Sequence, residues 1–261
     1  MELKTNLQGI LVYGTMGWFL LGMLFCLMKR EKVGGALFAV GFATACVSFG
    51  YRLYDVRHWP MQNLFEVFLS LGLAIYPISI FSEKKLKVRG GVADMLLGVI
   101  VLFPAGFFFS AEPTQLPPAL QSWFFAPHVT VYMFSYVFMA KATFQAAFQL
   151  AFSSDKSRSK AYEQATYYMI LAGFPLLTMG LILGSWWGKI AWGDYWGWDP
   201  KELWSLISWL IYVGYLHFRY MFGRKYSQYN SLLAILGMVA IILTLLWVNL
   251  SKIFQGLHNY A

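Results

Sequence analysis

The stretch SLLAILGMVAIILTLLWVNL, residues 231–250, contains no charged side chain. Twenty residues of α-helix span about 30 Å, which matches the hydrocarbon core of a lipid bilayer. The stretch therefore predicts a membrane-spanning helix. The composition of the 261-residue chain agrees, because it is 59% hydrophobic and 12% charged, whereas a soluble domain carries about 25% charged residues.

Similar apolar stretches recur along the rest of the chain. They predict an all-α, polytopic membrane protein with about eight transmembrane helices, forming a single integral membrane domain over residues 1–261. The first stretch is long enough to remain as an anchor, so we expect no cleavable signal peptide. We expect the helices near residues 8–28, 33–51, 62–81, 91–109, 123–150, 166–187, 201–222 and 231–250.

The positions of the Lys and Arg residues predict the orientation. Thirteen of the twenty follow the first, third, fifth or seventh expected helix; six lie on the opposite side, and Lys141 lies within the fifth helix. Cytoplasmic loops of membrane proteins are enriched in Lys and Arg, so both termini are expected on the non-cytoplasmic side. The net charge of +8 follows from this topology, and we expect no nucleic-acid partner.

The two cysteines, Cys26 and Cys46, are expected at different depths in the first two helices. A disulfide between them is not expected, and the chain has no CxxC motif for metal binding or thiol exchange. We interpret both as packing residues, so any thiol chemistry would come from a partner.

Residues 185–203 are expected to form an external loop that is rich in tryptophan. The window Trp186–Trp209 holds seven of the eleven Trp residues of the chain. Part of this region has a structural explanation, because Trp is common at membrane interfaces and the run Asp199, Pro200, Glu202 is typical of a helix start. An interfacial belt, however, would be spread over all helix ends.

The concentration of Trp instead indicates a binding surface. Glycines between the rings leave room for a large flat ligand. Indole rings can stack on a macrocycle, while Lys189, Lys201 or nearby arginines can pair with carboxylates at its edge. Haem has both features and is the candidate ligand.

The four histidines support this interpretation. His58, His128 and His258 are expected on the same side of the membrane as the Trp-rich loop, and imidazole is a common metal and haem ligand. His217 lies within the seventh expected helix, 18 residues after Asp199, which corresponds to about 27 Å. The spacing predicts two haem positions, one outside the membrane and one deeper.

Several stretches resemble a known family. WGDYWGWDPKELWSLISWLIYVGYLHFR (192–219) is similar to the WWD signature of the haem-handling proteins, and most similar to their CcsA (ResC) branch, which acts in System II cytochrome c maturation. The resemblance extends over about residues 50–261 and includes WPMQNLFE (59–66), PHVTVYMFSY (127–136) and GLHNYA (256–261). The first two helices match only in being hydrophobic.

The resemblance implies a function. Proteins of this kind act with a CcsB/ResB-like membrane protein as a cytochrome c synthase (haem lyase). The pair moves haem b from the cytoplasmic to the outer side and attaches it to the CxxCH segment of apocytochrome c. Thiol-reducing proteins serve the same pathway. The implied location is the bacterial cytoplasmic membrane or the thylakoid membrane.

The resemblance also implies site residues. His128 and His258 correspond to the two outer haem ligands, and His217 to the transmembrane histidine, whose iron takes its second ligand from the CcsB part. His58 is not a position that the resemblance carries over, and it stays a candidate only. A carboxylate such as Glu66 at the outer start of the third helix could have a functional role, cap the helix or bond another helix. Arg52 and Arg57 could meet haem propionates, and the sequence does not decide this. The remaining expected haem contacts come from the Trp-rich segment: Trp187, Trp192, Trp196, Trp198, Asp199 and Lys201.

Three alternatives remain at this point. The chain could be a CcmC- or CcmF-like component of the other bacterial maturation system, a secondary transporter whose Trp-rich loop is a lid, or a structural subunit with an enlarged aromatic belt. A haem absorbance band in the purified protein would separate the first from the other two.

Overall fold

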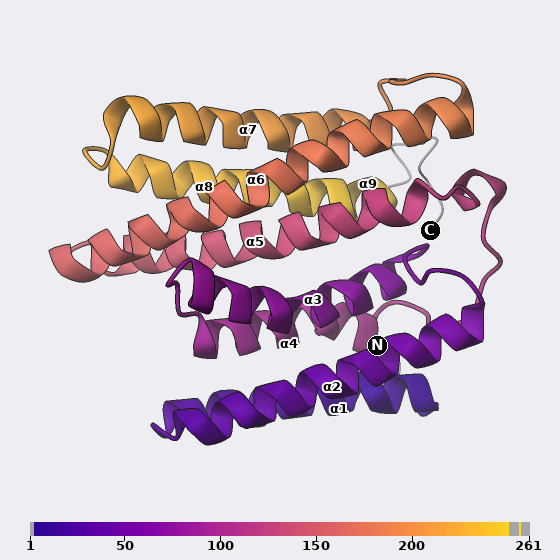
Figure 1. Cartoon of the computed structure of the whole chain (residues 1–261), viewed down its shortest axis with the longest axis horizontal. Helices are drawn as coiled ribbons and strands as arrows, with labels where there is room; N and C mark the ends of the chain where they lie inside the picture. The colour runs from indigo at the N-terminus through magenta and orange to yellow at the C-terminus, as the bar shows by residue number, and fades with distance from the viewer. Residues whose placement is uncertain (1–2, 251–255, 257–261) are drawn as a thin grey trace. The chain divides into compact units, whose positions relative to one another are not determined.

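The computed structural model describes residues 3–250 and residue 256, and its secondary structure is helical. The described part forms eight long helices (Figure 1), which confirms the all-α prediction. The last long helix continues through a π-helical turn, η2 (Leu243–Trp247), into α9 (Val248–Leu250), and a 3₁₀ turn, η1 (Pro118–Leu120), precedes α5. The bounds are α1 Leu7–Leu27, α2 Glu31–Val56, α3 Leu64–Lys85, α4 Gly91–Phe107, α5 Phe125–Ala151, α6 Lys156–Trp192, α7 Pro200–Phe222 and α8 Ser227–Ile242.

The main departure from the predicted bounds is α6, which runs from Lys156 to Trp192 rather than over residues 166–187. Its first turns are polar, but the Asp155 side chain caps them by accepting the backbone N–H of Ser157 and Arg158. At the other end α6 continues until Gly193, which has a φ of 90°. A prediction made from apolar stretches identifies only the middle part of such a helix, which is apolar enough to lie in lipid.

Among the described residues, five helical segments are long and apolar enough to cross a bilayer: α1, α2, α3, α6 and the continuous segment Ser227–Leu250. The helix α4 is apolar but shorter. The helices α5 and α7 carry more polar side chains, including Lys141 and His217.

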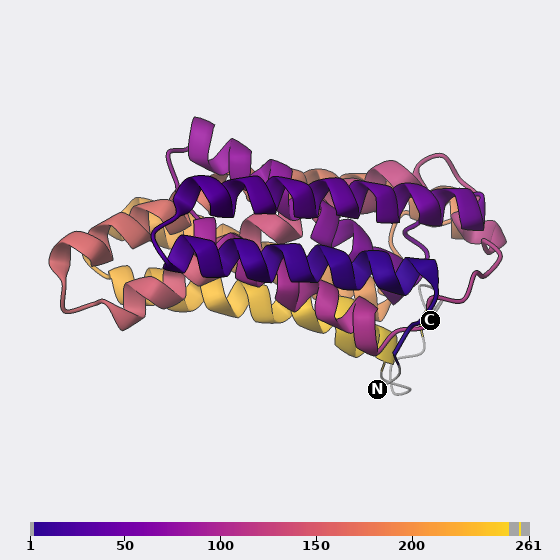
Figure 2. The same cartoon turned by 90° about the horizontal axis from the view of Figure 1, so that it is seen from below.

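Residues 3–120 form the first of two compact units. In it α1 packs against α2 and α4, while α3 packs against α4 and α2 (Figure 2). Phe19 of α1 is fully buried at the centre of this packing. A Cβ atom on Gly41 of α2 or on Gly98 of α4 would lie 2.6 Å from its ring, so glycines allow the three helices to approach closely.

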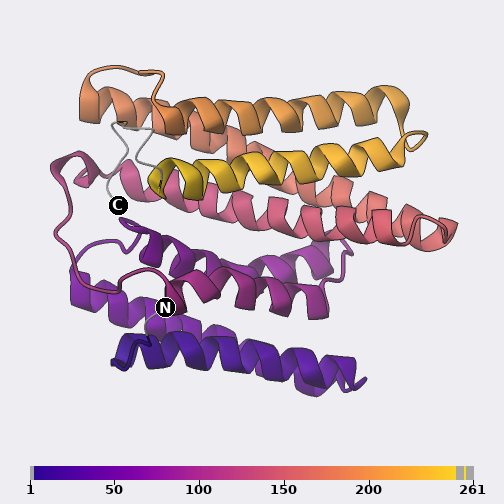
Figure 3. The same cartoon turned by 180° about the vertical axis from the view of Figure 1, so that it is seen from behind.

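The second unit comprises the described residues from 121 onward. Here α5 packs along α6 and α8, and α7 packs along α8 and α6 (Figure 3). Trp209 of α7 donates its indole N–H to Thr178 Oγ1 of α6 at 2.9 Å. Most of the predicted site residues lie in this unit, where α5 begins, α6 ends and α7 begins.

Candidate functional site

His128 lies in the first turn of α5 and is held against α6. Its Nδ1 lies 2.9 Å from the backbone carbonyl oxygen of Gly180. A carbonyl oxygen only accepts hydrogen bonds, so Nδ1 carries the proton and Nε2 of the neutral ring carries a lone pair. A metal-ligating histidine typically donates its other N–H to a carbonyl or carboxylate in this way. The geometry therefore suits an axial ligand.

Aromatic rings surround this imidazole. Trp187 of α6 stacks on it with ring centroids 5.7 Å apart and an interplanar angle of 27°. Trp192 packs edge-on against Trp187 at 4.8 Å. Trp187 is only 2% exposed, so it supports His128 from inside the protein, whereas Trp192 is half-buried at the end of α6.

One turn along α5, Tyr132 fixes the other side of His128. The two rings meet edge to face with centroids 5.0 Å apart, and the Tyr132 hydroxyl lies near the Ser205 side chain of α7. On α6, a Cβ atom at Gly184 would lie 2.5 Å from His128 Cε1, and one at Gly180 would lie 2.8 Å from the Tyr132 ring. Two glycines one turn apart thus form the slot that holds His128 and Tyr132.

The start of α7 has the capping pattern predicted from Asp199, Pro200 and Glu202, and the prediction is confirmed. Asp199 Oδ1 accepts the backbone N–H of Lys201 at 2.9 Å. Glu202 Oε2 accepts the backbone N–H of Asp199 at 3.0 Å and also that of Gly197 at 2.8 Å. Glu202 therefore anchors the preceding loop as well as the helix.

The segment predicted as a loop over residues 185–203 contains helix at both ends, and residues 193–199 connect α6 to α7. Trp196 and Trp198 lie in this connection, with ring centroids 6.0 Å apart and planes at 88°. Trp198 is 69% exposed. Its φ of 58° places it in the left-handed region, which bulky residues rarely adopt.

Lys189 occupies the α6 side of the same connection. Its ammonium donates to the carbonyl oxygen of Gly193 at 2.5 Å and lies 5.5 Å from the centre of the Tyr195 ring. Near the chain end, a Cβ atom on Gly256 would lie 2.1 Å from Asp199 Oδ2, so the backbone of Gly256 packs directly on this carboxylate. His258 lies outside the described residues.

His217 is far from His128 along the membrane helices. Its Nδ1 lies 2.8 Å from the Val213 carbonyl oxygen of its own helix, and the residue is exposed. Tyr132 reaches Ser205, which precedes His217 by twelve residues of α7, or about 18 Å. His128 lies a further turn away. The two imidazoles are therefore too far apart to share one iron atom.

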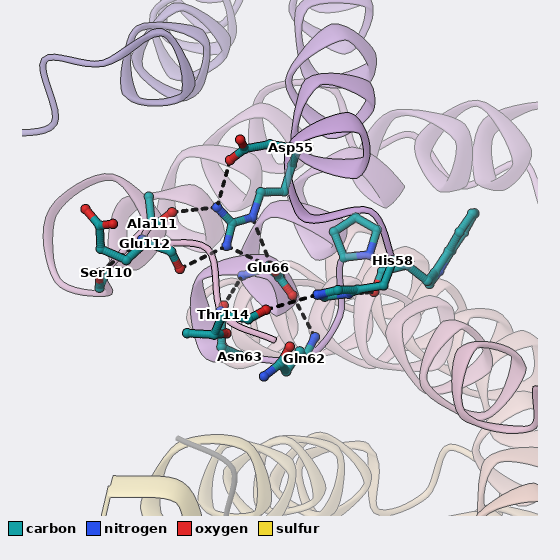
Figure 4. A network of polar contacts seen from close by, with 12 residues as sticks. Asp55, His58, Gln62, Asn63, Glu66, Ser110, Ala111, Glu112 and Thr114 are labelled. Atoms are coloured by element: carbon teal, nitrogen blue, oxygen red, sulfur yellow. Dashed lines mark hydrogen bonds and ion pairs between the residues drawn. The ribbon is translucent and has the colours of Figure 1, made fainter. Parts of the chain in front are cut away.

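The first unit contains a second cluster of polar residues, around Glu66, whose roles the sequence left open (Figure 4). Arg52 and Glu66 are 1% and 0% exposed. The Arg52 guanidinium bonds Glu66 Oε1 at 3.0 and 2.9 Å. It also donates to the carbonyl oxygens of Ala111 at 2.5 Å and Glu112 at 3.3 Å. This arginine is held by internal acceptors and joins α2, α3 and the segment after α4.

Two further residues left open by the sequence have internal contacts as well. Arg57 ends α2 with a φ of 61° and lies over the Tyr54 ring at 4.3 Å. His58 places Nδ1 at 3.1 Å from the carbonyl oxygen of Trp59 and Nε2 at 3.4 Å from that of Thr114 (Figure 4). Both ring nitrogens of His58 thus face backbone oxygens.

Comparisons with known proteins identify the family. Residues 61–258 match the profile described as "Cytochrome C assembly protein". The chain belongs to this family. The cytochrome c biogenesis protein CcsA of Mesostigma viride is 31% identical to it, with 80% of each sequence covered. CcsA of Guillardia theta is 30% identical, covering 92% of this chain and 90% of the relative.

A solved structure has the same fold. The cytochrome c haem lyase CcmF superposes with a TM-score of 0.69 at 19% identity, covering 94% of this chain and 48% of that protein. This chain therefore spans about half the length of that CcmF, and the likeness shows the fold alone.

The predicted resemblance to CcsA is confirmed, and the chain is an integral membrane protein with a role in cytochrome c maturation. The sequence relatives favour CcsA over the CcmC-like, CcmF-like and transporter alternatives.

Some site features were not predicted from the sequence. The hydrogen bond from His128 to Gly180 links residues 52 positions apart, and a single sequence carries no signal for such a pairing. Two signals were available. Tyr132 follows His128 by four residues, which places both on one helix face, and Gly180 and Gly184 have the same spacing on α6.

Proposed function

We propose that this protein binds haem as its substrate, moves it from the cytoplasmic to the outer side of the membrane and presents it for covalent attachment to apocytochrome c, together with a CcsB/ResB-like partner. One observation carries the proposal. The His128 imidazole is fixed by a hydrogen bond from Nδ1 to Gly180 and by stacking on Trp187, which gives Nε2 the tautomer and rigid support that an iron ligand needs.

In this proposal His128 and His258 are the two axial ligands of the outer haem. Trp187 supports His128, and Trp192, Trp196 and Trp198 contribute the aromatic surface for the macrocycle. Asp199 and Lys201 shape the base of that surface at the start of α7. The contact of Gly256 with Asp199 supports the inclusion of the C-terminal segment, because Gly256 lies two residues before His258 in the sequence.

His217 is the ligand of a second, inner haem. It is exposed on α7, and its Nδ1 is satisfied by its own helix, so a second ligand from the CcsB-like partner can approach the same iron. An ionisable side chain within a membrane-spanning segment is costly and usually has such a role.

The proposed topology has eight transmembrane helices in one integral membrane domain, with both termini and the Trp-rich segment on the non-cytoplasmic side. The Lys and Arg distribution supports this orientation. The membrane is the bacterial cytoplasmic membrane or the thylakoid membrane.

The attachment reaction adds each Cys S–H of the CxxCH segment across one haem vinyl group. The sulfur bonds to the vinyl carbon next to the ring, the proton goes to the terminal carbon, and no net oxidation occurs. Thiol-reducing proteins keep both cysteines reduced. The chain contributes orientation, because a fixed iron and a fixed ring plane bring vinyl and thiol groups within reach.

The test is purification of the tagged chain with its native membrane partners, followed by absorbance spectroscopy and an assay of cytochrome c formation. We expect a Soret band. Replacing His128 or His258 by Gly should abolish cytochrome c formation, and added imidazole should partly restore it. His217→Gly should instead deplete the co-purifying haem. A colourless wild-type protein, or normal maturation by both outer-histidine variants, would refute the proposal.

A further inference from the structure

We propose that Glu202 is a positioning residue that sets the arrangement of Trp196 and Trp198 and, through them, the orientation of the haem. This inference rests on the proposed function. It concerns a residue that the sequence pattern places in a helix cap.

The first observation is that Glu202 accepts one hydrogen bond more than a helix cap requires. A capping box needs one bond from the glutamate to the N-cap backbone, and the bond to Asp199 at 3.0 Å provides it. The same oxygen, Oε2, also accepts the N–H of Gly197 at 2.8 Å. These two N–H groups lie on either side of Trp198 in the chain, so one carboxylate oxygen fixes the backbone before and after that residue.

The second observation is the conformation between these two bonds. Trp198 has a φ of 58°, a left-handed conformation that is costly for a residue with a bulky side chain and usually occurs at functional sites. The side chain is 69% exposed, so burial of the indole does not compensate for the cost. The paired bonds to Glu202 are the contacts that hold the backbone in this state.

The consequence is a fixed angle between two indole rings. Trp196 and Trp198 meet edge to face, with centroids 6.0 Å apart and planes at 88°. If the backbone of Trp198 relaxed to negative φ, its ring would leave this arrangement. Glu202 therefore acts through the loop and need not touch the haem.

The experiment compares three substitutions in the complete, haem-loaded complex. Glu202→Gln keeps an oxygen at the same reach and should behave like the wild type. Glu202→Asp is one methylene shorter and Glu202→Ala has no acceptor, so neither can hold both N–H groups. For these two we expect haem occupancy to fall by about fivefold, the scale associated with loss of one capping side chain, together with a shifted Soret maximum and iron midpoint potential.

Glu31→Ala is the matched control, because it removes an exposed first-turn glutamate from the start of α2. It should leave occupancy, Soret maximum and potential unchanged. If Glu202→Gln is as defective as Glu202→Ala, charge rather than hydrogen bonding matters and the inference is wrong. If Glu202→Ala has the same haem occupancy as Glu31→Ala while the wild type binds haem, the inference about Glu202 is wrong and the proposed function is unaffected. Absence of haem from the wild type would refute the proposed function itself.

Discussion

Two helices of this protein begin with the same local pattern and use it differently. At α3, Asn63 is the N-cap and Glu66 follows three residues later; at α7, Asp199 and Glu202 have the same spacing. Glu66 Oε2 accepts the backbone N–H of Gln62 at 2.8 Å, just as Glu202 accepts N–H groups of its preceding loop.

The two glutamates differ in their burial and in the groups that their carboxylates contact. Glu66 is fully buried and paired with the equally buried Arg52, which also holds two backbone carbonyl groups. Glu202 is partly exposed, and its two bonds go to the loop that carries Trp196 and Trp198. The glutamate of the first helix start thus stabilises the interior of the first unit. The glutamate of the second helix start holds a surface loop that carries aromatic side chains. A motif in the sequence predicts the cap but not this distinction.

The largest effect is expected at the buried pair of Arg52 and Glu66 at the start of α3. Arg52→Ala leaves Glu66 as a buried carboxylate without its cationic partner, and removing one member of a buried ion pair typically costs about 3–5 kcal/mol. We expect a strongly lowered Tm or loss of folded protein, measured by thermal unfolding in detergent.

A double variant sharpens this prediction. Arg52→Leu combined with Glu66→Leu removes both charges, and apolar replacement of a complete buried pair is often near neutral. The double variant should therefore be more stable than Arg52→Ala. If Arg52→Ala unfolds like the wild type, the cluster around Glu66 does not stabilise the fold, and the proposed difference between the two helix starts disappears.

An intermediate effect is expected at Gly184. An added methyl group would lie 2.5 Å from His128 Cε1, so Gly184→Ala should displace the imidazole. Overpacking of this kind costs about 1–3 kcal/mol, and we expect a clear loss of co-purifying haem in a chain that still folds.

Gly17→Ala is the control for this substitution, since a Cβ atom at Gly17 of α1 would meet nothing within 4 Å among the described residues. It should retain haem and Tm. Equal haem content in the two variants would show that the slot on α6 does not position His128.

These predictions separate what the sequence could show from what it could not. The helix count and the cap at Asp199 followed from local patterns, because apolar length and capping depend on neighbouring residues. The family followed from the resemblance of several stretches, above all residues 192–219. The extra turns of α6 were missed because they are polar. The contacts of His128 with Gly180 and of Arg52 with Glu66, Ala111 and Glu112 depend on how separate helices pack, which no single stretch encodes.

The smallest effect is expected at Asp199, and it tests the role of the start of α7. Asn is as good an N-cap as Asp, so Asp199→Asn should change stability by only about a few tenths of a kcal/mol, whereas Asp199→Ala loses the bond to the Lys201 N–H and should cost about 1 kcal/mol. Thermal unfolding and haem content of both variants should be measured side by side. If Asp199 acts only as a cap, Asp199→Asn retains haem as well as stability. If it loses haem at unchanged Tm, the negative charge itself serves the site. The start of α7 would then differ from that of α3 in a second respect, with a carboxylate that acts on the ligand in addition to ending the loop.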